Sequence, residues 1–350
     1  QDAERVLKVA LDEAAAARLD DEAAVLRRLD TPRIVKLIEG PIVVGGRRAL
    51  LLENAGRDLR AGTSPTATTL ADVLRARTRL SLDLLERYGT DLLDALVVLD
   101  KAGIDHRDIK PANLGVREGR GDRTKHLVLF DFSLSKAAAA ATAAGTPPYL
   151  DPFLIGTRDR YDSAAERYAA SVVLFEMATG RTPVYGDADA DPATVPDEAI
   201  VEPELFDPAL AEALVGFFRT ALARDAAARH HTAEALRSAW LSIFTDPATT
   251  QPDESHDELA ARATLATPLR DSGLTARALS ALEPYAVQTV GELLTVDRVR
   301  LGNMKGVANA TRLQILARIK QWRARLGDTS APSPVAGTLP TPTDAAELLV

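Results

Sequence analysis

The spacing of apolar residues changes along the chain, from alternation near the N-terminus to helical spacing further on. Residues 5–10 alternate, which predicts a short strand. Gly45 and Gly46 predict a tight hairpin turn, because both central positions of such a turn favour glycine. The N-terminal part therefore predicts a small sheet, and further β-rich runs lie at residues 34–37, 41–44 and 48–52.

Helical spacing is present at residues 14–29 and dominates from Leu70 onward. Apolar residues recur every three or four positions, which is typical of helices that bury one face. Strands first and helices afterwards is an α+β order. We predict an α+β, bilobal fold with a small sheet-rich lobe before a larger helical one. Its long amphipathic helices are expected at Leu82–Ala102, Ser163–Thr179 and Pro208–Arg224.

Length and composition divide the chain into domains. Its 350 residues are enough for about two domains, and Pro-, Thr- and acid-rich stretches mark the boundaries. We predict a first domain over residues 1–245, an acidic linker over 246–258, a helical domain over 259–327 and a flexible tail over 328–350. Short helices of the second domain are expected at residues 275–282, 289–294, 296–301 and 310–326.

Charge is unevenly distributed between these domains. The whole chain carries a net charge of −8. Residues 261–325 hold eleven basic and four acidic side chains, a balance of +7, so the remaining residues carry −15. An asymmetry of this size indicates two bodies with different partners.

Several classes of protein are excluded by what the sequence lacks. It contains no cysteine, which excludes disulfides, thiol catalysis and cysteine-ligated zinc. Its five histidines have no metal-ligand spacing. No apolar run reaches the roughly 18 residues that span a bilayer, and the charged stretch Gln1–Val9 does not have the pattern of a signal peptide. We therefore expect a cytoplasmic protein without a membrane contact.

The candidate chemistry lies in the run HRDIKPAN at residues 106–113 and in the sequence Asp-Phe-Ser that begins at Asp131. Phosphoryl transfer needs positioned groups and neutralised charge more than covalent catalysis. One carboxylate must orient the attacking hydroxyl, a lysine must meet the transferred phosphate, and an amide with a second carboxylate must hold Mg²⁺. Asp108, Lys110, Asn113 and Asp131 supply these groups in a compact order.

This pattern resembles the eukaryotic-type (Hanks-type) protein kinase domain, over residues 4–244. The resemblance implies that Asp108 is the catalytic base, that Lys110 contacts the γ-phosphate, and that Asn113 and Asp131 are Mg²⁺ ligands. Lys110 together with Thr146 follows the serine/threonine pattern rather than the tyrosine pattern. The implied cofactors are ATP and Mg²⁺, and the implied substrate is a protein hydroxyl.

The same resemblance implies the remainder of the nucleotide site. Lys8 is similar to the strand lysine that holds the α- and β-phosphates, and Glu22 to its ion-pair partner on a helix. Leu52 resembles the gatekeeper, after which the backbone from Glu53 to Ala55 would hold adenine. The chain has eight lysines against 34 arginines, yet lysine stands at both phosphate positions, where a compact ammonium is not interchangeable with arginine.

Four departures from the family pattern bear on activity. The chain begins too late for a Gly-rich loop, and we expect the strands that would carry it to be missing from this sequence. Ser133 replaces a glycine, which restricts the backbone there. Phe153 replaces the glutamate that pairs with Arg229, a role open to Asp151. Glu166 replaces an aspartate that supports the catalytic loop.

The basic helical domain contains a glycine turn, residues 302–308, before its last helix. Backbone N–H groups at such a turn, with Lys305 inside it, can bind a phosphate, which is the arrangement of a helix-hairpin-helix. Residues 269–322 also resemble the C-terminal domain of the bacterial RNA polymerase α subunit. The positive charge favours contact of residues 260–327 with duplex DNA through phosphates. The alternative is a basic bundle that packs on the kinase or on a partner protein.

Together these features indicate a Mg·ATP-dependent serine/threonine kinase joined to a nucleic-acid- or protein-binding helical module. A bacterial kinase with such a tail resembles the kinases of phage-exclusion (phage growth limitation) defence systems. The alternative is a pseudokinase, a scaffold that binds nucleotide and signals through its conformation. A third hypothesis makes the basic tail the effector and the kinase fold its regulator.

Overall fold

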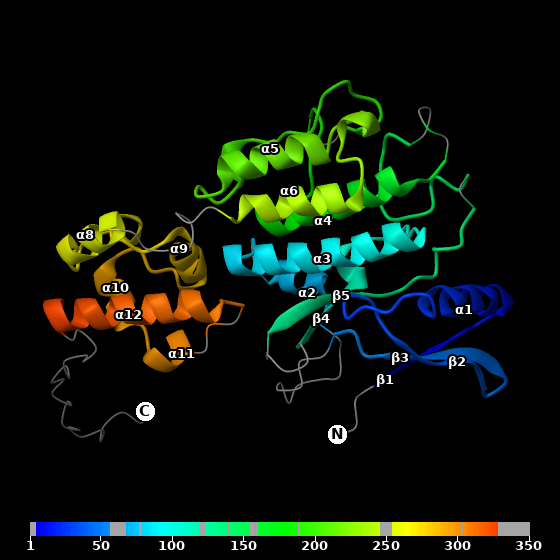
Figure 1. Ribbon diagram of the computed structural model, residues 1–350, viewed down its shortest axis with the longest axis horizontal. Helices are drawn as coiled ribbons and strands as arrows, with labels where there is room; N and C mark the ends of the chain where they lie inside the picture. The colour runs from blue at the N-terminus through cyan, green and yellow to red at the C-terminus, as the bar shows by residue number, and fades with distance from the viewer. Residues whose placement is uncertain are drawn as a thin grey trace, which may run out of the picture.

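The chain folds into a sheet-containing lobe, a larger helical lobe and a separate helical module, which lie in that order along the long axis of the molecule (Figure 1). The α+β, bilobal order predicted from the sequence is confirmed. This computed structural model describes residues 5–56, 68–76, 79–118, 124–138, 140–154, 158, 160–187, 190–245, 254–302, 304 and 306–327. The predicted flexible tail lies outside the described residues.

The N-terminal lobe is an antiparallel sheet covered by one helix. Its strands are β1 (Arg5–Val9), β2 (Leu37–Val44) and β3 (Arg47–Glu53), in the order β1-β3-β2. Gly45 and Gly46 both have positive φ, 57° and 76°, as the predicted hairpin turn requires. The strand predicted at residues 34–37 begins only at its last residue, because the Val35 N–H bonds to the Leu129 carbonyl instead.

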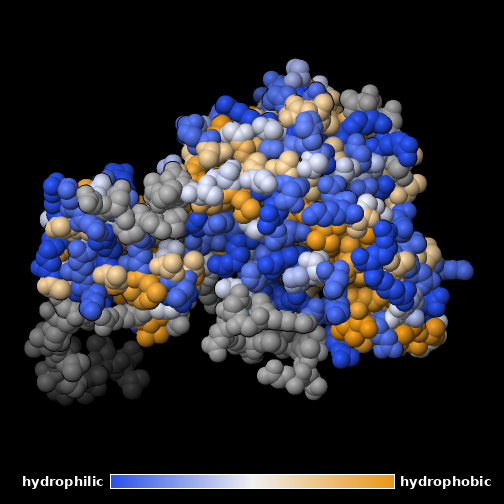
Figure 2. Space-filling model, in the orientation of Figure 1, coloured by the Kyte–Doolittle hydropathy of each residue, from blue (hydrophilic) through white to orange (hydrophobic). Residues whose placement is uncertain are grey.

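The helix of this lobe is α1 (Glu13–Leu26), which is capped by Asp12 through a 2.7 Å hydrogen bond from the Ala15 N–H. It buries Leu19, Ala23 and Leu26, whose spacing places them on one face. The sheet buries its apolar residues less completely. Figure 2 shows apolar side chains gathered over this lobe, and those of the sheet that stay exposed are Val6, Leu7, Val9, Ile38, Val43 and Val44.

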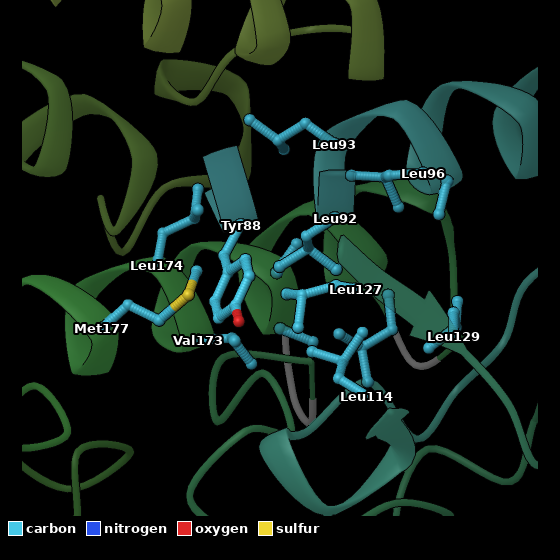
Figure 3. Close-up of a cluster of buried hydrophobic side chains, with 14 of the residues drawn as sticks. Tyr88, Leu92, Leu93, Leu96, Leu114, Leu127, Leu129, Val173, Leu174 and Met177 are labelled. Carbon is cyan, nitrogen blue, oxygen red and sulfur yellow. The ribbon is translucent and has the colours of Figure 1, made fainter. Parts of the chain in front are cut away.

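The helical lobe is built around two long, buried helices, α3 (Leu82–Ala102) and α4 (Ser163–Thr179), which match the predicted bounds. Tyr88 and Leu92 of α3 pack with Val173 and Met177 of α4 and with Leu127 in one apolar cluster (Figure 3). Burying side chains of this size is the main stabilising term for such a lobe, about 1.5–3 kcal/mol each. The elements are α2 (Leu70–Arg75), α3 (Leu82–Ala102), β4 (Leu114–Glu118), β5 (Lys125–Leu129), α4 (Ser163–Thr179), α5 (Ala211–Ala221) and α6 (Ala233–Ile243).

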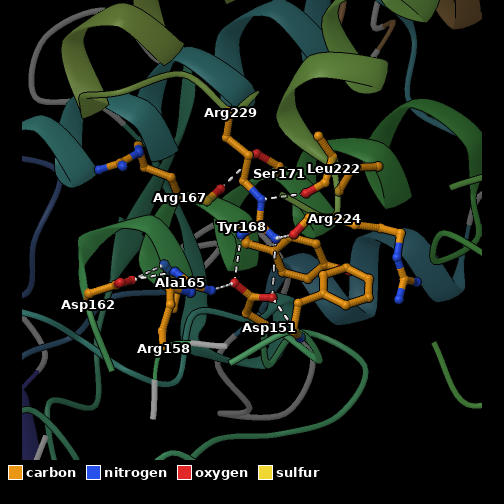
Figure 4. A network of polar contacts seen from close by, with 12 residues as sticks. Asp151, Arg158, Asp162, Ala165, Arg167, Tyr168, Ser171, Leu222, Arg224 and Arg229 are labelled. Atoms are coloured by element: carbon orange, nitrogen blue, oxygen red, sulfur yellow. Dashed lines mark hydrogen bonds and ion pairs between the residues drawn. The ribbon is translucent and has the colours of Figure 1, made fainter. Parts of the chain in front are cut away.

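A buried ion pair holds the C-terminal part of this lobe together (Figure 4). The Arg229 Nη1 donates to Asp151 Oδ2 at 2.6 Å, and both side chains are at most 1% exposed. Arg158 is a second partner of Asp151. The Phe153 ring, which stands where the kinase family has glutamate, lies under the Arg224 guanidinium at 4.4 Å. Asp151 therefore takes over the pairing that Phe153 cannot make, as the sequence suggested.

The module is a bundle with a core of its own. Trp322 is fully buried at its centre and donates from Nε1 to the Ala260 carbonyl at 3.0 Å. Because Ala260 belongs to this core, the last part of the predicted linker, residues 254–258, is helical in the structure. The helices are α8 (Glu254–Arg262), α9 (Ala276–Leu282), α10 (Val290–Thr295), α11 (Arg298–Gly302) and α12 (Asn309–Leu326). Among the described residues, no helix has the length and apolar content that crossing a bilayer requires.

Replacing Asp151 by alanine should lower the free energy of unfolding by about 3–5 kcal/mol, because Arg229 would stay buried without its carboxylate partner. Urea denaturation followed by tryptophan fluorescence measures this loss. Asp187→Ala removes an exposed carboxylate from the same lobe and should change stability by less than about 0.5 kcal/mol. Equal effects of the two substitutions would contradict a structural role for the buried pair.

Candidate active site

Three charged side chains from separate elements meet where the two lobes join. Lys8 lies on β1, Glu22 on α1 and Asp131 two residues after the end of β5. The Lys8 Nζ donates to Glu22 Oε2 and to Asp131 Oδ1, each at 2.7 Å. Glu22 is fully buried, and its Oε1 accepts the Phe132 N–H at 3.3 Å. The predicted pair of Lys8 and Glu22 is therefore formed, and Lys8 joins it to Asp131.

Local periodicity explains why these side chains point inward. Lys8 is the one partly buried residue of β1, and it pairs in register with Leu50 of the central strand. On α1, Glu22 lies three residues after Leu19 and four before Leu26, on the helix face that covers the sheet. A strand lysine and a helix glutamate are thus directed at one another across the lobe.

The charges of this group stabilise one another. Burial acts to lower the pKa of Lys8, but the charge of Glu22 and hydrogen bonds to both carboxylates outweigh it and raise the pKa above 10.5. Burial acts to raise the pKa of Asp131, but the bond from Lys8 and its charge outweigh that effect and lower the pKa below 3.8. Both side chains are therefore charged at neutral pH.

Asp131 is held in an uncommon backbone conformation, with a φ of 68°. Such a conformation in a non-glycine residue is a mark of functional sites. Ser133, which stands where the family has glycine, has no positive φ, and its hydroxyl bonds to the Asp131 carboxylate and helps to lower the pKa of that group. The replacement of glycine by serine is therefore accommodated at this site.

His106 anchors the catalytic loop to the strand that precedes Asp131. Its Nε2 lies 3.0 Å from the Phe130 carbonyl, and its Nδ1 accepts the Asp108 N–H at 3.3 Å. Complete burial lowers the pKa of His106 to about 4, so the ring is neutral. A neutral ring with its proton on Nε2 satisfies both bonds. The Phe130 N–H also bonds to the Asn113 carbonyl at 3.0 Å, which ties both ends of the loop to this strand.

The side chains of the predicted catalytic loop converge on Asp108. Lys110 Nζ and Asn113 Nδ2 donate to Asp108 Oδ2 at 2.7 and 2.9 Å. The Thr146 hydroxyl donates to Oδ1 at 2.6 Å and accepts a bond from Lys110 at 2.7 Å. Asp108 thus accepts hydrogen bonds from an ammonium, an amide and a hydroxyl group.

Glu166 binds the backbone of this loop, in place of the family's aspartate. Its Oε1 accepts the Arg107 N–H at 2.5 Å and the Tyr161 hydroxyl at 2.7 Å. Arg107 has a positive φ of 70°, and its guanidinium lies over the Tyr161 ring at 4.7 Å. Burial raises the pKa of Glu166 to about 7, against the hydrogen bonds that lower it. The longer side chain therefore still reaches the catalytic loop.

The donor set fits Mg²⁺. Asn113 Nδ2 is engaged with the carbonyl and the carboxylate of Asp108, so its amide oxygen is the atom left for a cation. Asp131 adds a carboxylate that is 35% exposed. The described residues contain no cluster of three or more His, Cys, Asp or Glu that could hold a metal. One carboxylate and one amide oxygen suit a cation that takes one or two protein ligands and completes its shell with phosphates and water.

The predicted hinge follows the last strand of the N-terminal lobe. Glu53 ends β3 and pairs with Arg117 at 2.8 Å. Ala55 is buried, and its carbonyl lies so close to Gly115 that a Cβ there would approach it to 2.4 Å. The hinge backbone is therefore fixed against β4. Contact of Glu53 and Ala55 with adenine stays a prediction.

The structure thus gathers the residues that the sequence singled out into two linked groups. Lys8, Glu22 and Asp131 form one, and Asp108, Lys110 and Asn113 form the other. The sequence did not show that Lys8 bonds to Asp131 as well as to Glu22. It also did not show the support of Glu166 by Tyr161, since no local signal marks a tyrosine as the partner of a glutamate five residues later.

A bilobal fold with these two groups at the junction of its lobes is the arrangement of a protein kinase domain. The family model for the protein kinase domain matches residues 4–241, and the chain belongs to this family. It is 40% identical to the probable kinase PglW of Streptomyces coelicolor, over 92% of this chain and 24% of that protein.

Two eukaryotic kinases are also similar. Serine/threonine-protein kinase ATG1c of Arabidopsis thaliana is 31% identical over 52% of this chain and 24% of its own length. Calcium/calmodulin-dependent protein kinase type 1B of Homo sapiens is 29% identical over 65% of this chain and 63% of its own length. The chain therefore spans about a quarter of PglW and of the plant kinase.

Glu166 should make the stability of the protein depend on pH. Its pKa in the fold, about 7, lies above the ordinary 4.5, so the folded state holds the proton more tightly than the unfolded state. The resulting stabilisation is complete below pH 4.5 and is lost as pH rises through 7. Relative to Glu166→Gln, the wild type should lose roughly 3 kcal/mol of unfolding free energy between these limits.

Urea denaturation at pH 4.5, 6 and 8 measures this difference. Glu204→Gln, which removes an exposed carboxylate, is the matched control and should follow the wild type at every pH. A constant difference between wild type and Glu166→Gln across the range would show that Glu166 does not titrate in the fold.

Proposed function

We propose that the chain is the catalytic part of an active serine/threonine kinase that transfers the ATP γ-phosphate to protein hydroxyls. The observation that carries this proposal is the arrangement around Asp108. Its carboxylate is bonded to Lys110, Asn113 and the hydroxyl of Thr146. A carboxylate that already binds a hydroxyl beside a lysine is arranged for in-line transfer.

Each residue then has a role in the reaction. Asp108 orients the substrate hydroxyl and accepts its proton, and Lys110 neutralises charge on the transferred phosphate. Lys8, fixed by Glu22, holds the α- and β-phosphates. The backbone of Glu53 and Ala55 holds adenine. Asp131 and Asn113 hold Mg²⁺, which neutralises phosphate charge when bound.

The pseudokinase alternative predicts a site that has lost part of this set. Its support in the sequence is Ser133, Phe153 and Glu166. Ser133 bonds to Asp131, Asp151 pairs with Arg229 in place of Phe153, and Glu166 bonds to the catalytic loop. These three of the four departures thus have a local compensation, which favours an active enzyme over a scaffold.

The proposal extends to the module and the setting. Similarity to PglW covers 92% of the chain, and so reaches beyond the kinase domain match at residues 4–241. This supports a kinase and a helical module that work together, in a cytosolic phage-exclusion defence as the domain combination suggests. Two kinds of partner are proposed for the basic module, duplex DNA phosphates and protein.

Asp108→Asn should lower phosphoryl transfer by about 10²–10⁴-fold, because the side chain keeps its shape but no longer accepts a proton. Incorporation of ³²P from Mg·ATP measures it, with the protein as it is made in its own host. Asp187→Asn, an exposed change in the same lobe, should leave the rate unaltered. Defence against phage in the host should be lost with Asp108→Asn.

Transfer that is equally absent in wild type and Asp108→Asn, while both bind ATP, would sink the enzymatic proposal in favour of the scaffold. Intact phage exclusion by Asp108→Asn would separate the defence role from catalysis.

A further inference from the structure

The module presents an oxyanion-binding site that is already filled by a carboxylate of the kinase domain. Asp83 lies in the first turn of α3. Its Oδ1 accepts a bond from Arg277 Nη1 of α9 at 3.0 Å, and its Oδ2 accepts the Ala308 N–H at 2.8 Å. Ala308 is the N-cap of α12. The site therefore combines a guanidinium with the positive end of a helix, both of which favour an anion.

This contact is buried and charged, which makes it specific. The side chains of Asp83 and Arg277 are 3% and 9% exposed. Arg277 makes a second ion pair, with Glu86 one turn along α3 at 2.7 Å. Removing one partner of such a group leaves an uncompensated charge in the interface, which is strongly unfavourable.

The capping is reciprocal. Ser81, the N-cap of α3, makes no side-chain cap bond. The Leu82 N–H at the start of this helix instead donates to the Ser280 hydroxyl of α9 at 3.1 Å. The module therefore satisfies a backbone donor at the start of α3, and the kinase domain satisfies one at the start of α12. Figure 1 shows the module at this end of α3.

The surfaces of the module and of the kinase domain also lie close together at this contact. Gly306, in the glycine turn, has a φ of 80°, and a Cβ there would come within 2.4 Å of Leu84 of α3. The turn therefore lies directly on the kinase helix. At the edge of the contact, Arg79 forms an ion pair with Glu283. Gly306 and Ala308 of the turn, which the sequence predicted to bind a phosphate, therefore contact α3 instead. Lys305, the lysine of that prediction, lies outside the described residues.

At least four of the eleven basic side chains at residues 261–325 bond within the module. Several arginines donate to backbone carbonyls, as Arg312 does to Met304 and Val307. Arg323 donates to the Leu294 carbonyl, and Arg325 to the Ala260 carbonyl. Arg318 pairs with Asp257. These four guanidinium groups are therefore directed at the module's own backbone or at Asp257, so their positions are fixed by the module itself.

We infer that the partner of the module is the kinase domain itself, and that Asp83 is the resident ligand of the oxyanion site formed by Arg277 and the N-terminus of α12. While Asp83 occupies it, this site is closed to a DNA phosphate. The inference rests on the proposed function in one respect. Of the two kinds of partner proposed there, duplex DNA and protein, it names protein.

The test measures docking in the whole chain. Because the sequence has no cysteine, Ala213→Cys on α5 and Ala317→Cys on α12, both exposed, give a unique pair of spin labels. A single narrow distance between them is expected. Asp83→Asn, which keeps the shape of the side chain, and Arg277→Ala should each lower the docked-to-undocked ratio about a hundredfold, which broadens the distribution.

The double variant Asp83→Asn/Arg277→Ala should be no broader than the single variants, because the residues act as one contact. Arg270→Ala is the matched control. It removes an arginine of the same module that is 82% exposed and should keep the narrow distance. Narrow distances in both Asp83→Asn and Arg277→Ala, with far-UV circular dichroism unchanged, would overturn the inference.

Binding of a 20-base-pair duplex at low salt tests occupancy of the site. The inference is supported if the duplex binds Asp83→Asn but binds neither the wild type nor Asp83→Asn/Arg277→Ala. It is also supported if the duplex binds none of the variants. Binding by wild type that Arg277→Ala weakens and Asp83→Asn leaves unchanged overturns it. Phosphoryl transfer by Asp83→Asn should stay at the wild-type rate, so failure of docking and failure of the kinase proposal are separate results.

Discussion

The hydrogen-bonded group of Lys8, Glu22 and Asp131 is the contact on which the kinase arrangement depends. It joins a strand, a helix and the segment after β5, which are up to 123 residues apart in sequence. Two carboxylates share one ammonium, so an excess negative charge stays at the side of Asp131, where a cation is to bind. The group thereby joins β1 and α1 of the N-terminal lobe to Asp131 of the catalytic lobe, the residue proposed to bind the cation.

A second constraint is the helix α3, which links the module to the catalytic loop. It begins at the contact between Asp83 and Arg277. Midway, Asp91 binds the Leu127 N–H of β5 at 2.9 Å and pairs with Arg33 at 2.9 Å. It ends at Gly103, three residues before His106. One buried helix therefore connects the docked module, the strand that leads to Asp131 and the loop that carries Asp108, which explains why its N-terminus is a suitable place for a second domain.

Sequence patterns predicted the local features well. The bounds of α3 and α4 follow from apolar spacing and from Gly103 and Gly180, which end them with positive φ. The catalytic loop follows from an unbroken run of eight residues. Pairing of Asp151 with Arg229 was foreseen because the missing glutamate at Phe153 left a buried arginine in need of a carboxylate.

Packing of the module on the kinase was one alternative from the sequence, but the residues that make the contact were beyond sequence reasoning for physical reasons. Asp83 at the start of a helix is an ordinary residue, since it is favourable to the helix dipole without any partner. Arg277, 194 residues away, looked like one more positive charge in a basic segment. The charge count indicated a polyanion as ligand, whereas Arg312, Arg323 and Arg325 bond to carbonyls of their own fold and Arg277 pairs with carboxylates of the kinase domain. Net charge does not show where each guanidinium points.

Calorimetry of ATP binding with and without Mg²⁺ tests the central claim most directly, because the account requires Asp131 and Asn113 to hold a cation beside the nucleotide. Magnesium should strengthen ATP binding by at least about tenfold, and Asp131→Asn should remove this gain while Asp187→Asn keeps it. Equal affinity for ATP with and without Mg²⁺ in the wild type would contradict the account and leave a nucleotide-binding scaffold.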